Sequence, residues 1–328
     1  MTIRVAATGV GHWHSLYDAK YLNIFDDIPD TELVGIQDTQ MSVAEHRSAA
    51  IGKGTPVFTD YRKMIDDTKP DFVLALGRHD EMAETARYLV ENDIPFMMEK
   101  PMGLNSDQVG EVAELAASRN SFAAVPFTQR YLPWTQQARE LLNTGNLGTV
   151  SHLYFRNNRP TSDRYLAWDS EWMFDPAMGG GCLRNLGIHG IDLFLHLTGE
   201  DVEVIGAQSS NRVHGRAVED YVTVMLRTPS GILGTIESGN TFPQDGTDGE
   251  WKISGSKVLL AAKDGKIRRV TADADETSEG APHQHLSITA VEQILAAWRA
   301  GEKPPASVVD CYRANKVVDA AFDLIRSR

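Results

Sequence analysis

The stretch IRVAATGVGHWH, residues 3–14, runs from an apolar strand pattern into a glycine-rich turn. Gly9 permits the tight turn, and Gly11 lets a pyrophosphate approach the backbone where a helix begins. His14 stands where the usual dinucleotide-binding fingerprint has its third glycine, so the motif is imperfect. The order of strand, glycine turn and helix nevertheless predicts a dinucleotide site.

Asp38 supports this interpretation, because it ends the next predicted strand, Glu32–Gln37, 27 residues after Gly11. A carboxylate at that place accepts hydrogen bonds from the adenine ribose and repels a 2′-phosphate. No arginine follows within several residues, which favours NAD over NADP. The alternative is an ordinary turn between a strand and a helix, with a loop aspartate.

The two histidines of this turn do not indicate a metal site. His12 and His14 are two residues apart, and no neighbouring cysteine or carboxylate completes a ligand set. We therefore predict no metal. We expect His12, Trp13 and His14 to pack on the cofactor or to line the entrance of its site.

The first half of the chain alternates predicted strands and helices, which is typical of a doubly wound parallel sheet with helices on both faces. The predicted strands are Ile3–Thr8, Glu32–Gln37, Asp71–Leu76, Ile94–Met98 and Phe122–Phe127. The predicted helices follow the glycine turn as far as Phe25 and cover Ser42–Ile51, Glu81–Asn92 and Ser106–Ser118. We expect an α/β Rossmann domain over residues 1–127.

After about residue 150, closely spaced strand patterns separated by turn residues indicate antiparallel hairpins. The predicted strands are Val202–Gln208, Asp220–Arg227, Ile232–Ser238, Glu250–Ser254 and Lys257–Ala262, with helices over Asn185–Leu197, Ser287–Ala300 and Val308–Ser327. Asp273–His285, rich in Asp, Glu, Ser and Gly, is expected to be a mobile loop. Residues 128–328 are thus predicted to form an α+β domain with one large open, mainly antiparallel sheet.

The composition is that of a soluble globular protein. Hydrophobic residues make up 42% and charged residues 23% of the 328 residues, and no stretch approaches the roughly 18 uninterrupted apolar residues of a membrane span. The net charge of −13 argues against nucleic-acid binding. The N-terminus runs straight into a strand pattern without a visible signal peptide, and only two cysteines occur, so we expect a cytoplasmic location.

Lys100 is the first candidate for chemistry. It lies in Glu99-Lys100-Pro101, directly after the apolar run Ile94–Met98. Pro101 has no N–H for a strand ladder, so the chain should leave the sheet there. An ammonium at the carboxyl end of a parallel strand lies where open α/β sheets bind ligands. The alternative is a solvated lysine that only ends the strand.

A second polar group follows the glycine run Gly179–Gly181. If the chain continues there as a helix, Asn185, His189 and Asp192 share one face. A histidine in that position can exchange protons near neutral pH, as hydride transfer at a carbinol requires. The alternative is a satisfied core histidine with Asp192 as its hydrogen-bond partner.

Together these motifs resemble the Gfo/Idh/MocA family of nicotinamide-dependent oxidoreductases. The resemblance covers essentially the whole chain and rests on Gly9, Gly11, Asp38, Glu99-Lys100-Pro101, Gln129-Arg130-Tyr131, Trp172, Asp175-Pro176, Gly179–Gly181, Gly187, His189 and Asp192. It implies a Rossmann domain that binds the cofactor, a second domain whose open sheet makes oligomer contacts, and a sugar, polyol or related substrate. By this resemblance Lys100 hydrogen-bonds the reacting oxygen, and His189 acts as acid and base.

Two positions depart from the family pattern. Asn185 stands where many members carry aspartate, and an amide can orient a hydroxyl or Lys100 but cannot take a proton. Arg78 and His79 replace a Thr-Pro-Asn-like turn, and Arg78 either contacts the pyrophosphate or a substrate anion, or is solvated. The predicted cofactor residues are Gly9, Gly11, His12, Trp13, His14, Asp38, Gly77, Arg78, His79, Glu99 and Lys100.

Arginines and aromatic residues gather before the glycine run. Such residues can stack on a sugar ring and bind hydroxyls or a carboxylate, but they can equally cap the sheet at a subunit contact. The predicted substrate residues are Lys100, Arg156, Arg164, Trp168, Trp172, Asn185 and His189. We expect Arg130 to buttress the domain junction rather than to meet substrate.

The leading hypothesis is an oxidoreductase that transfers a hydride between NAD and a carbinol or carbonyl of a sugar, polyol or related compound, working as a homodimer or homotetramer. Lys100 polarises or deprotonates the reacting hydroxyl, His189 exchanges its proton, and Asn185 orients. Two alternatives stay open. One is glycoside cleavage by transient oxidation on tightly bound NAD, and the other is a non-catalytic regulator that senses the dinucleotide.

Overall fold

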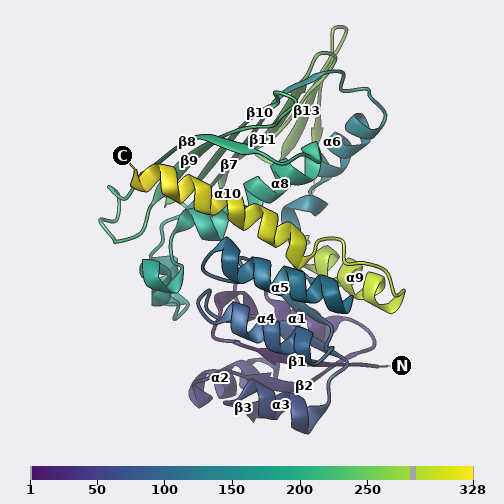
Figure 1. Cartoon of the computed structure of the whole chain (residues 1–328), viewed down its shortest axis with the longest axis vertical. Coiled ribbons are helices and arrows are strands. Elements are labelled where there is room, and N and C mark those ends of the chain that lie inside the picture. Colours follow the sequence, from purple (N-terminus) through teal and green to yellow (C-terminus); the bar gives the residue numbers. More distant parts are fainter. Residues whose placement is uncertain (1, 281–285, 328) are drawn as a thin grey trace.

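The computed structural model describes residues 2–280 and 286–327 and contains two β-sheets, one from each half of the chain. In Figure 1 the N-terminal sheet and its helices form the lower part of the molecule, and the second sheet forms the upper part. The C-terminal helices α9 (Leu286–Arg299) and α10 (Val308–Arg326) lie between the two parts.

The first sheet has six parallel strands in the order β3-β2-β1-β4-β5-β6. Its strands are β1 (Ile3–Thr8), β2 (Thr31–Gln37), β3 (Val57–Phe58), β4 (Phe72–Ala75), β5 (Phe96–Met98) and β6 (Ala123–Ala124). Its helices are α1 (Tyr21–Asp27), α2 (Met41–Ile51), α3 (Tyr61–Thr68), α4 (Met82–Glu91) and α5 (Ser106–Arg119). The central strands β4 and β5 are buried throughout, which explains their continuous apolar sequences. The predicted Rossmann fold class is confirmed.

The segment after β1 differs from the predicted helix. A single 3₁₀ turn, Trp13–Ser15, follows the glycines, and α1 begins only at Tyr21. His12 caps the short turn, because its Nδ1 accepts a hydrogen bond from the backbone N–H of His14 at 3.1 Å. The indole of Trp13 is buried among aromatic side chains of the second half of the chain. Tertiary packing, rather than a helical repeat, therefore fixes this segment.

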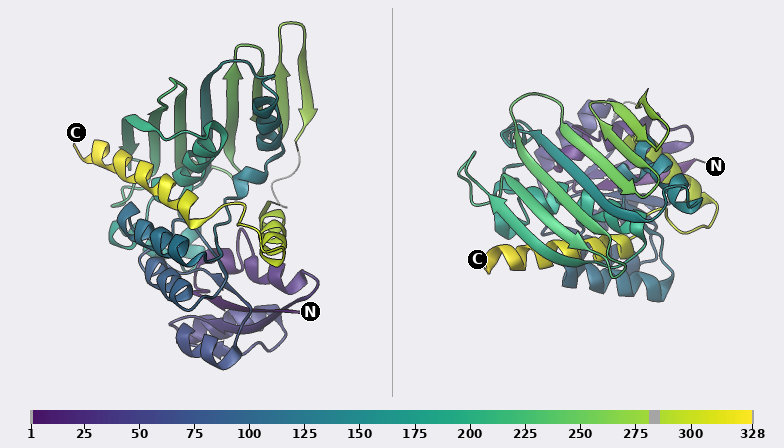
Figure 2. Two further views of the ribbon diagram at one scale, coloured as in Figure 1. Left: turned by 45° about the vertical axis from the view of Figure 1, so that its right-hand side comes forward. Right: turned by 90° about the horizontal axis from the view of Figure 1, so that it is seen from above.

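The second sheet has eight strands in the order β14-β13-β12-β11-β7-β10-β9-β8, and only β7 and β10 pair in parallel. Its strands are β7 (Val150–Pro160), β8 (Glu203–Ser210), β9 (Tyr221–Arg227), β10 (Leu233–Phe242), β11 (Asp248–Gly255), β12 (Leu259–Lys263), β13 (Lys266–Val270) and β14 (Asp275–Glu279). Helices α6 (Pro133–Asn143), α8 (Ile188–Thr198) and α10 lie on one side, whereas the view from above in Figure 2 shows the strands of the opposite face uncovered. The predicted open, mainly antiparallel sheet is confirmed.

Three strands of this sheet were not predicted. The strand β13 follows the last predicted strand, Lys257–Ala262, and was assigned to no element. The loop predicted over Asp273–His285 is wrong in its first part, because β14 pairs there with β13, while residues 281–285 lie outside the described residues. All five side chains of β14 are exposed and polar, so the strand has no hydrophobic signal. The strand β7 was not predicted at all, because its inward positions change from Leu153 and Phe155 to Asn157 and Arg159 as it reaches the cavity.

The C-terminal helices tie the two sheets together. Helix α9 returns to the first sheet, where Val291, Ile294 and Leu295 share a core cluster with β1. Helix α10 packs against both α5 and β8. The strand β6 ends at Ala124, close to the predicted domain boundary after residue 127, and that boundary stays a prediction.

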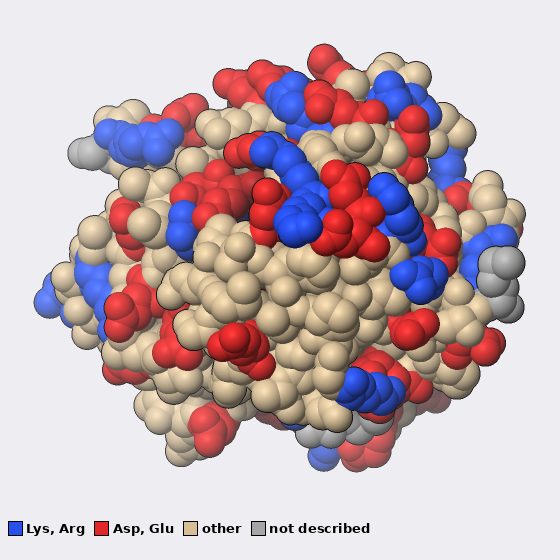
Figure 3. All heavy atoms as spheres, turned by 90° about the horizontal axis from the view of Figure 1, so that it is seen from below, with Lys and Arg blue, Asp and Glu red and all other residues tan. Residues whose placement is uncertain are grey.

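Charged side chains of both signs are mixed on the face of the molecule seen from below. Figure 3 shows Lys and Arg side chains beside Asp and Glu, around a region without charged side chains. On this face the described basic side chains lie among acidic ones and form no continuous basic surface. Within the described ranges, no helix is both long and apolar enough to cross a membrane.

Candidate active site

Lys100 follows β5 and is held by the helix region of the second half. Its ammonium is 1% exposed and donates hydrogen bonds to Asn185, to Oδ1 at 2.5 Å and to the backbone carbonyl at 3.0 Å. Burial lowers the pKa of Lys100, and the carboxylate of Glu99 opposes this shift only in part. The lysine is thereby shifted toward the neutral amine, which can take a proton from a hydroxyl.

A π-helical turn, Leu183–Gly187, directs Asn185 and His189 toward this lysine from just before and within α8. Asn185 Nδ2 donates a hydrogen bond to the hydroxyl of Tyr165 at 2.8 Å, so its Oδ1 is oriented to accept from Lys100. Irregular turns of this kind occur frequently at functional sites. The sequence predicted the shared face of these side chains but not the π-helical turn.

His189 is a neutral imidazole at neutral pH. Its burial, reinforced by the charge of Lys100, lowers the pKa of His189 to about 3. Among the residues that the structure describes, none provides a hydrogen-bond partner for His189 Nδ1. Asp192 instead forms a buried ion pair with Arg130, with Oδ1 and Nη2 2.5 Å apart. The alternative in which Asp192 satisfies His189 is therefore excluded.

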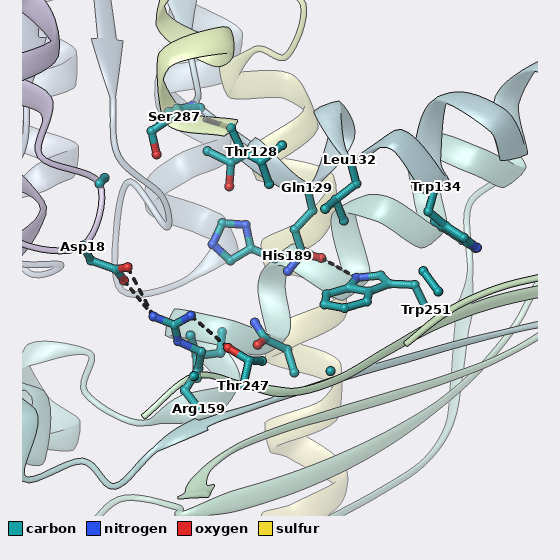
Figure 4. A pocket seen from close by; sticks show the side chains of 18 of the residues that line it. Asp18, Thr128, Gln129, Leu132, Trp134, Arg159, His189, Thr247, Trp251 and Ser287 are labelled. Carbon is teal, nitrogen blue, oxygen red and sulfur yellow. Dashed lines mark hydrogen bonds and ion pairs between the residues drawn. The ribbon is translucent and has the colours of Figure 1, made fainter. Parts of the chain in front are cut away.

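A cavity of about 710 Å³ opens in front of these groups. Figure 4 shows the ring of His189 pointing into it, between Arg159 on one side and Gln129 with Trp251 on another. Arg159 holds an ion pair with Asp18 at 3.2 Å and donates a hydrogen bond to Thr247 at 3.1 Å. The cavity thus combines aromatic surface with polar groups, which suits a small hydroxylated ligand.

A second hollow, a groove of about 430 Å³, lies at the glycine turn. Six of the eleven predicted cofactor residues line it: Gly9, Gly11, His12, Asp38, Gly77 and Arg78. Four others, Trp13, His14, Glu99 and Lys100, line the larger cavity instead, and His79 lines neither hollow. A Cβ atom at Gly9 would lie 2.6 Å from Gly77 Cα, and one at Gly11 would lie 2.8 Å from Asp38 Oδ2. Only glycine leaves this cradle open, and the carboxylate of Asp38 borders it, so the residues present fit a dinucleotide.

An aromatic cluster lies between the groove and the cavity. Trp172 lines the groove and packs on Trp13, with ring centroids 5.6 Å apart, while Trp13 lines the cavity. His12 stacks on Trp13 at 3.9 Å, and its Nε2 is buried without a partner in the described part of the chain. His79 is also buried, and its Nδ1 shares a hydrogen bond with the Gly179 carbonyl at 2.8 Å. A dinucleotide that reaches both hollows must run along this cluster.

Three predicted substrate residues lie away from the cavity. Arg156 alternates with the inward residues of β7 and lies on the open face of the sheet, beside Tyr154. Trp168 stacks on Tyr17 at 5.9 Å, and Trp172 lines the cofactor groove rather than the cavity. Sequence position alone did not reveal on which side of the sheet or turn these side chains lie.

Arg164 does line the cavity, but its guanidinium is hydrogen-bonded to other side chains of the protein. It donates hydrogen bonds to Asn240 Oδ1 at 2.7 Å and to the hydroxyl of Tyr165 at 3.0 Å. Cavity residues that the sequence did not single out include Asp18, Tyr21 and Gln129. Of these, only Gln129 stood in a family motif, so only it carried a signal.

Comparison with known proteins identifies the family. Residues 3–127 match the model of an oxidoreductase family with an NAD-binding Rossmann fold, and residues 135–261 match the model of the GFO/IDH/MocA C-terminal domain. The chain therefore belongs to the GFO/IDH/MocA family of oxidoreductases. The predicted family, fold class and class of activity, a nicotinamide-dependent oxidoreductase, are confirmed.

Individual relatives are similar over most of the chain. The rhizopine catabolism protein MocA of Rhizobium meliloti is 23% identical over 296 residues, covering 83% of this chain and 88% of that protein. D-glucoside 3-dehydrogenase of Escherichia coli K12 is 26% identical over 247 residues, covering 73% of this chain and 67% of that protein. Among solved structures, levoglucosan dehydrogenase in complex with NADH and levoglucosan has the same fold, with a TM-score of 0.86 at 18% identity over 100% of this chain and 98% of that chain.

Proposed function

We propose that this protein is an NAD-dependent dehydrogenase that oxidises a secondary hydroxyl of a sugar, polyol or related compound, or reduces the corresponding carbonyl. One observation carries the proposal. The buried side chain of Lys100 and His189, whose Nδ1 has no partner among the described residues, line the same cavity. The relatives named as glucoside and levoglucosan dehydrogenases support the substrate class.

The residues divide the work between positioning and proton transfer. Asn185 Oδ1 and the Asn185 backbone carbonyl accept two hydrogen bonds from Lys100 Nζ, so the remaining position on the nitrogen can face the reacting oxygen, as a lone pair in the neutral amine or as an N–H in the ammonium. His189 Nδ1, neutral at pH 7, accepts a hydrogen bond from the same or an adjacent hydroxyl. When bound, the nicotinamide supplies the hydride acceptor or donor. Lys100 takes up the hydroxyl proton in oxidation and returns it in reduction.

Asp38 supports NAD rather than NADP as the cofactor. Its carboxylate borders the groove and is oriented by the backbone N–H groups of Gly11 and Gln40, at 2.7 and 3.1 Å. A fixed negative charge there binds the hydroxyls of the adenine ribose and repels a 2′-phosphate. Arg78 does not compensate, because its guanidinium is paired with Asp80 and Glu81.

The proposal extends to assembly and location. The uncovered face of the second sheet supports a homodimer or homotetramer formed through that sheet. The two cysteines, Cys182 and Cys311, are buried and free, which supports the reducing conditions of the cytoplasm.

A spectrophotometric screen tests the activity. The purified protein is mixed with NAD or NADP and with myo-inositol, methyl D-glucosides, levoglucosan and other polyols, and reduced nicotinamide is followed by absorbance. We expect turnover with NAD on at least one compound, and Lys100→Met should lower kcat by about 100- to 10,000-fold with cofactor affinity retained. Lys303→Met, an exposed lysine between α9 and α10, is the matched control and should keep full activity.

Three outcomes would overturn the assignment. Retained turnover in Lys100→Met would remove the lysine from the chemistry. Binding of NAD without turnover on the whole panel would favour the dinucleotide-sensing regulator, and product release without net NADH formation would favour glycoside cleavage by transient oxidation.

A further inference from the structure

A row of ionisable side chains leads from Lys100 to the surface. Lys100 Nζ lies 4.0 Å from Glu99 Oε2, Glu99 Oε1 lies 3.0 Å from His14 Nδ1, and His14 Nε2 lies 3.6 Å from Asp18 Oδ2. The side chains become steadily more exposed along this row, from 1% for Lys100 through 2% and 13% to 40% for Asp18. Only the Glu99–His14 step is within hydrogen-bond distance, whereas the steps of 4.0 and 3.6 Å need a bridging water or a small side-chain movement for a proton to pass.

Glu99 lies between Lys100 and His14 in this row. Among the residues that the structure describes, it is the only carboxylate within 4.0 Å of Lys100 Nζ. Its Oε2 faces Lys100, whose backbone N–H also donates to it at 3.2 Å. Its Oε1 faces His14 and accepts a hydrogen bond from the Tyr21 hydroxyl at 2.8 Å. A carboxylate can receive a proton on one oxygen and release it from the other.

Asn185, the closest neighbour of the ammonium, cannot serve in this way. Its amide oxygen accepts a hydrogen bond from Lys100, but an amide does not take up a proton. Lys100, Glu99, His14 and Asp18 line the same cavity, in which the proposed substrate would lie. Glu99 is the first group along the row from Lys100 that is able to take up its proton.

Each ring nitrogen of His14 lies near a carboxylate, Nδ1 at 3.0 Å from Glu99 and Nε2 at 3.6 Å from Asp18, although Nδ1 makes no well-aligned hydrogen bond within the described residues. Burial by itself would lower its pKa, but Glu99 and Asp18 outweigh burial and raise the pKa of His14 above its ordinary value. The other groups around it are His12, whose Nδ1 accepts from the His14 backbone, the ring of Tyr21, the neutral imidazole of His189, and the guanidinium of Arg159, which pairs with the same Asp18. An imidazole can take up a proton at Nδ1 and release one from Nε2, so His14 is chemically suited to pass a proton from one carboxylate to the other.

We propose that Glu99, His14 and Asp18 form a proton relay between Lys100 and solvent. The inference rests on the proposed dehydrogenase function. In oxidation the substrate carbon gives its hydride to the nicotinamide, and the hydroxyl gives its proton to the neutral amine of Lys100. Lys100 passes a proton to Glu99, Glu99 passes one to His14 Nδ1, and His14 releases one from Nε2 to Asp18 and water. Reduction runs the same transfers backwards.

The test compares two variants that touch the same oxygen of Glu99. His14→Gln keeps a hydrogen-bond donor beside Glu99 but cannot carry a proton onward. Tyr21→Phe removes the other hydrogen bond to Glu99 Oε1 without removing a proton carrier, because burial raises the pKa of Tyr21 far above neutrality. Proton release is followed with a pH indicator, together with NADH formation, in a single turnover on the best substrate of the screen.

We expect proton release to lag behind NADH formation in His14→Gln, by about tenfold or more in rate, and to stay synchronous in the wild type and in Tyr21→Phe. In His14→Ala, free imidazole added to the solution should restore synchronous release. Synchronous release in His14→Gln, or an equal lag in Tyr21→Phe, would overturn the relay and leave only a structural role.

A second readout needs no turnover. In nitrogen-15 NMR titrations of the cofactor-free protein, the Lys100 and His14 signals are assigned by their loss in Lys100→Met and His14→Gln. We expect His14→Gln to raise the pKa of Lys100 by about one unit, because Glu99 then loses a cationic partner and stabilises the ammonium more strongly. An unchanged pKa of Lys100 in His14→Gln would contradict the proposed relay. If no compound of the screen is turned over, the dehydrogenase proposal is wrong. The titration does not depend on turnover and still shows whether His14 is coupled to Lys100 through Glu99.

Discussion

At the scale of single residues, the protonation of Lys100 depends on which neighbours carry charge. The two hydrogen bonds from its ammonium end on the amide oxygen and backbone carbonyl of Asn185, neither of which is charged. Burial is then the largest influence on the pKa of Lys100, and it acts downward. A carboxylate in the place of this amide would reverse much of that effect.

Asn185→Asp tests this account. The new carboxylate would favour the ammonium and raise the pKa of Lys100 by about one unit or more. Oxidation needs the neutral amine, so the limb on which kcat/KM falls toward acidic pH should move to higher pH by the same amount. The measurement is the pH profile of kcat/KM. Asn157→Asp adds a carboxylate to the same cavity without replacing a hydrogen-bond partner of Lys100, and an equal shift there would contradict the argument.

At the scale of elements, α8 serves both the site and the junction of the two sheets. Its His189 faces the cavity, while Asp192 turns to Arg130. The guanidinium of Arg130 also binds Asp310 at the start of α10, with Nη2 and Oδ1 2.9 Å apart. This ion pair fixes α8 relative to α10 and therefore fixes the position of His189 relative to the first sheet.

Arg130→Leu should lower the free energy of unfolding by about 3–5 kcal/mol at pH 7, because it leaves the buried carboxylate of Asp192 uncompensated. Burial tends to raise the pKa of Asp310, but Arg130 and the cap of α10 outweigh it and lower that pKa. The Asp310 contribution is complete above about pH 4, the ordinary aspartate value, and is lost as pH falls through the lowered pKa. The pKa of Asp192 is instead raised by burial, which Arg130 only partly offsets, and the loss of Arg130 would raise it further. The stability gap between the wild type and the variant should therefore begin to narrow when pH falls through the raised pKa of Asp192 and should narrow further at strongly acidic pH.

Urea unfolding at pH 7 and at acidic pH measures this gap. Arg326→Leu is the matched control, since Arg326 pairs with Asp323 on the exposed surface of the same C-terminal helix. Loss of an exposed pair costs about 0–1 kcal/mol. An equal loss of stability in the two variants would show that the buried junction has no special role.

At the scale of the whole molecule, the second sheet has one face packed on helices and one face uncovered (Figure 2). The uncovered face carries a hydrogen-bonded group of Tyr154, Tyr221 and Glu237, next to the exposed apolar side chains of Met225 and Leu233. Large apolar side chains on an ordered sheet are suited to burial against a second copy of the chain.

We expect the wild type to sediment as a dimer or tetramer, and the double variant Met225→Lys, Leu233→Lys to sediment as a monomer, because lysines on this face would have to be desolvated on assembly. Analytical ultracentrifugation measures both. Met41→Lys changes an equally exposed methionine on α2 in the first half and should leave the assembly intact. If the wild type sediments as a monomer, the proposed assembly through the uncovered face of the second sheet is wrong.

The sequence by itself determined the family, the order of the two sheets and most of the side chains proposed for the chemistry. Gly9, Gly11, Asp38, Lys100 and His189 lie on elements whose local patterns are strong, since glycine turns and apolar strands depend on near neighbours in the chain. Such patterns place a residue at a strand end or on a helix face without knowledge of what lies opposite.

Only the tertiary structure decided which side chains meet. The partners of Lys100 come from 85 residues away, and the partner of Asp192 lies 62 residues away, distances over which no local pattern extends. The same is true of β14, which has no apolar side and is ordered by its pairing with β13. His14 illustrates the contrast most clearly: in the sequence it is an imperfection of a glycine motif, and in the fold it stands between the carboxylates of Glu99 and Asp18.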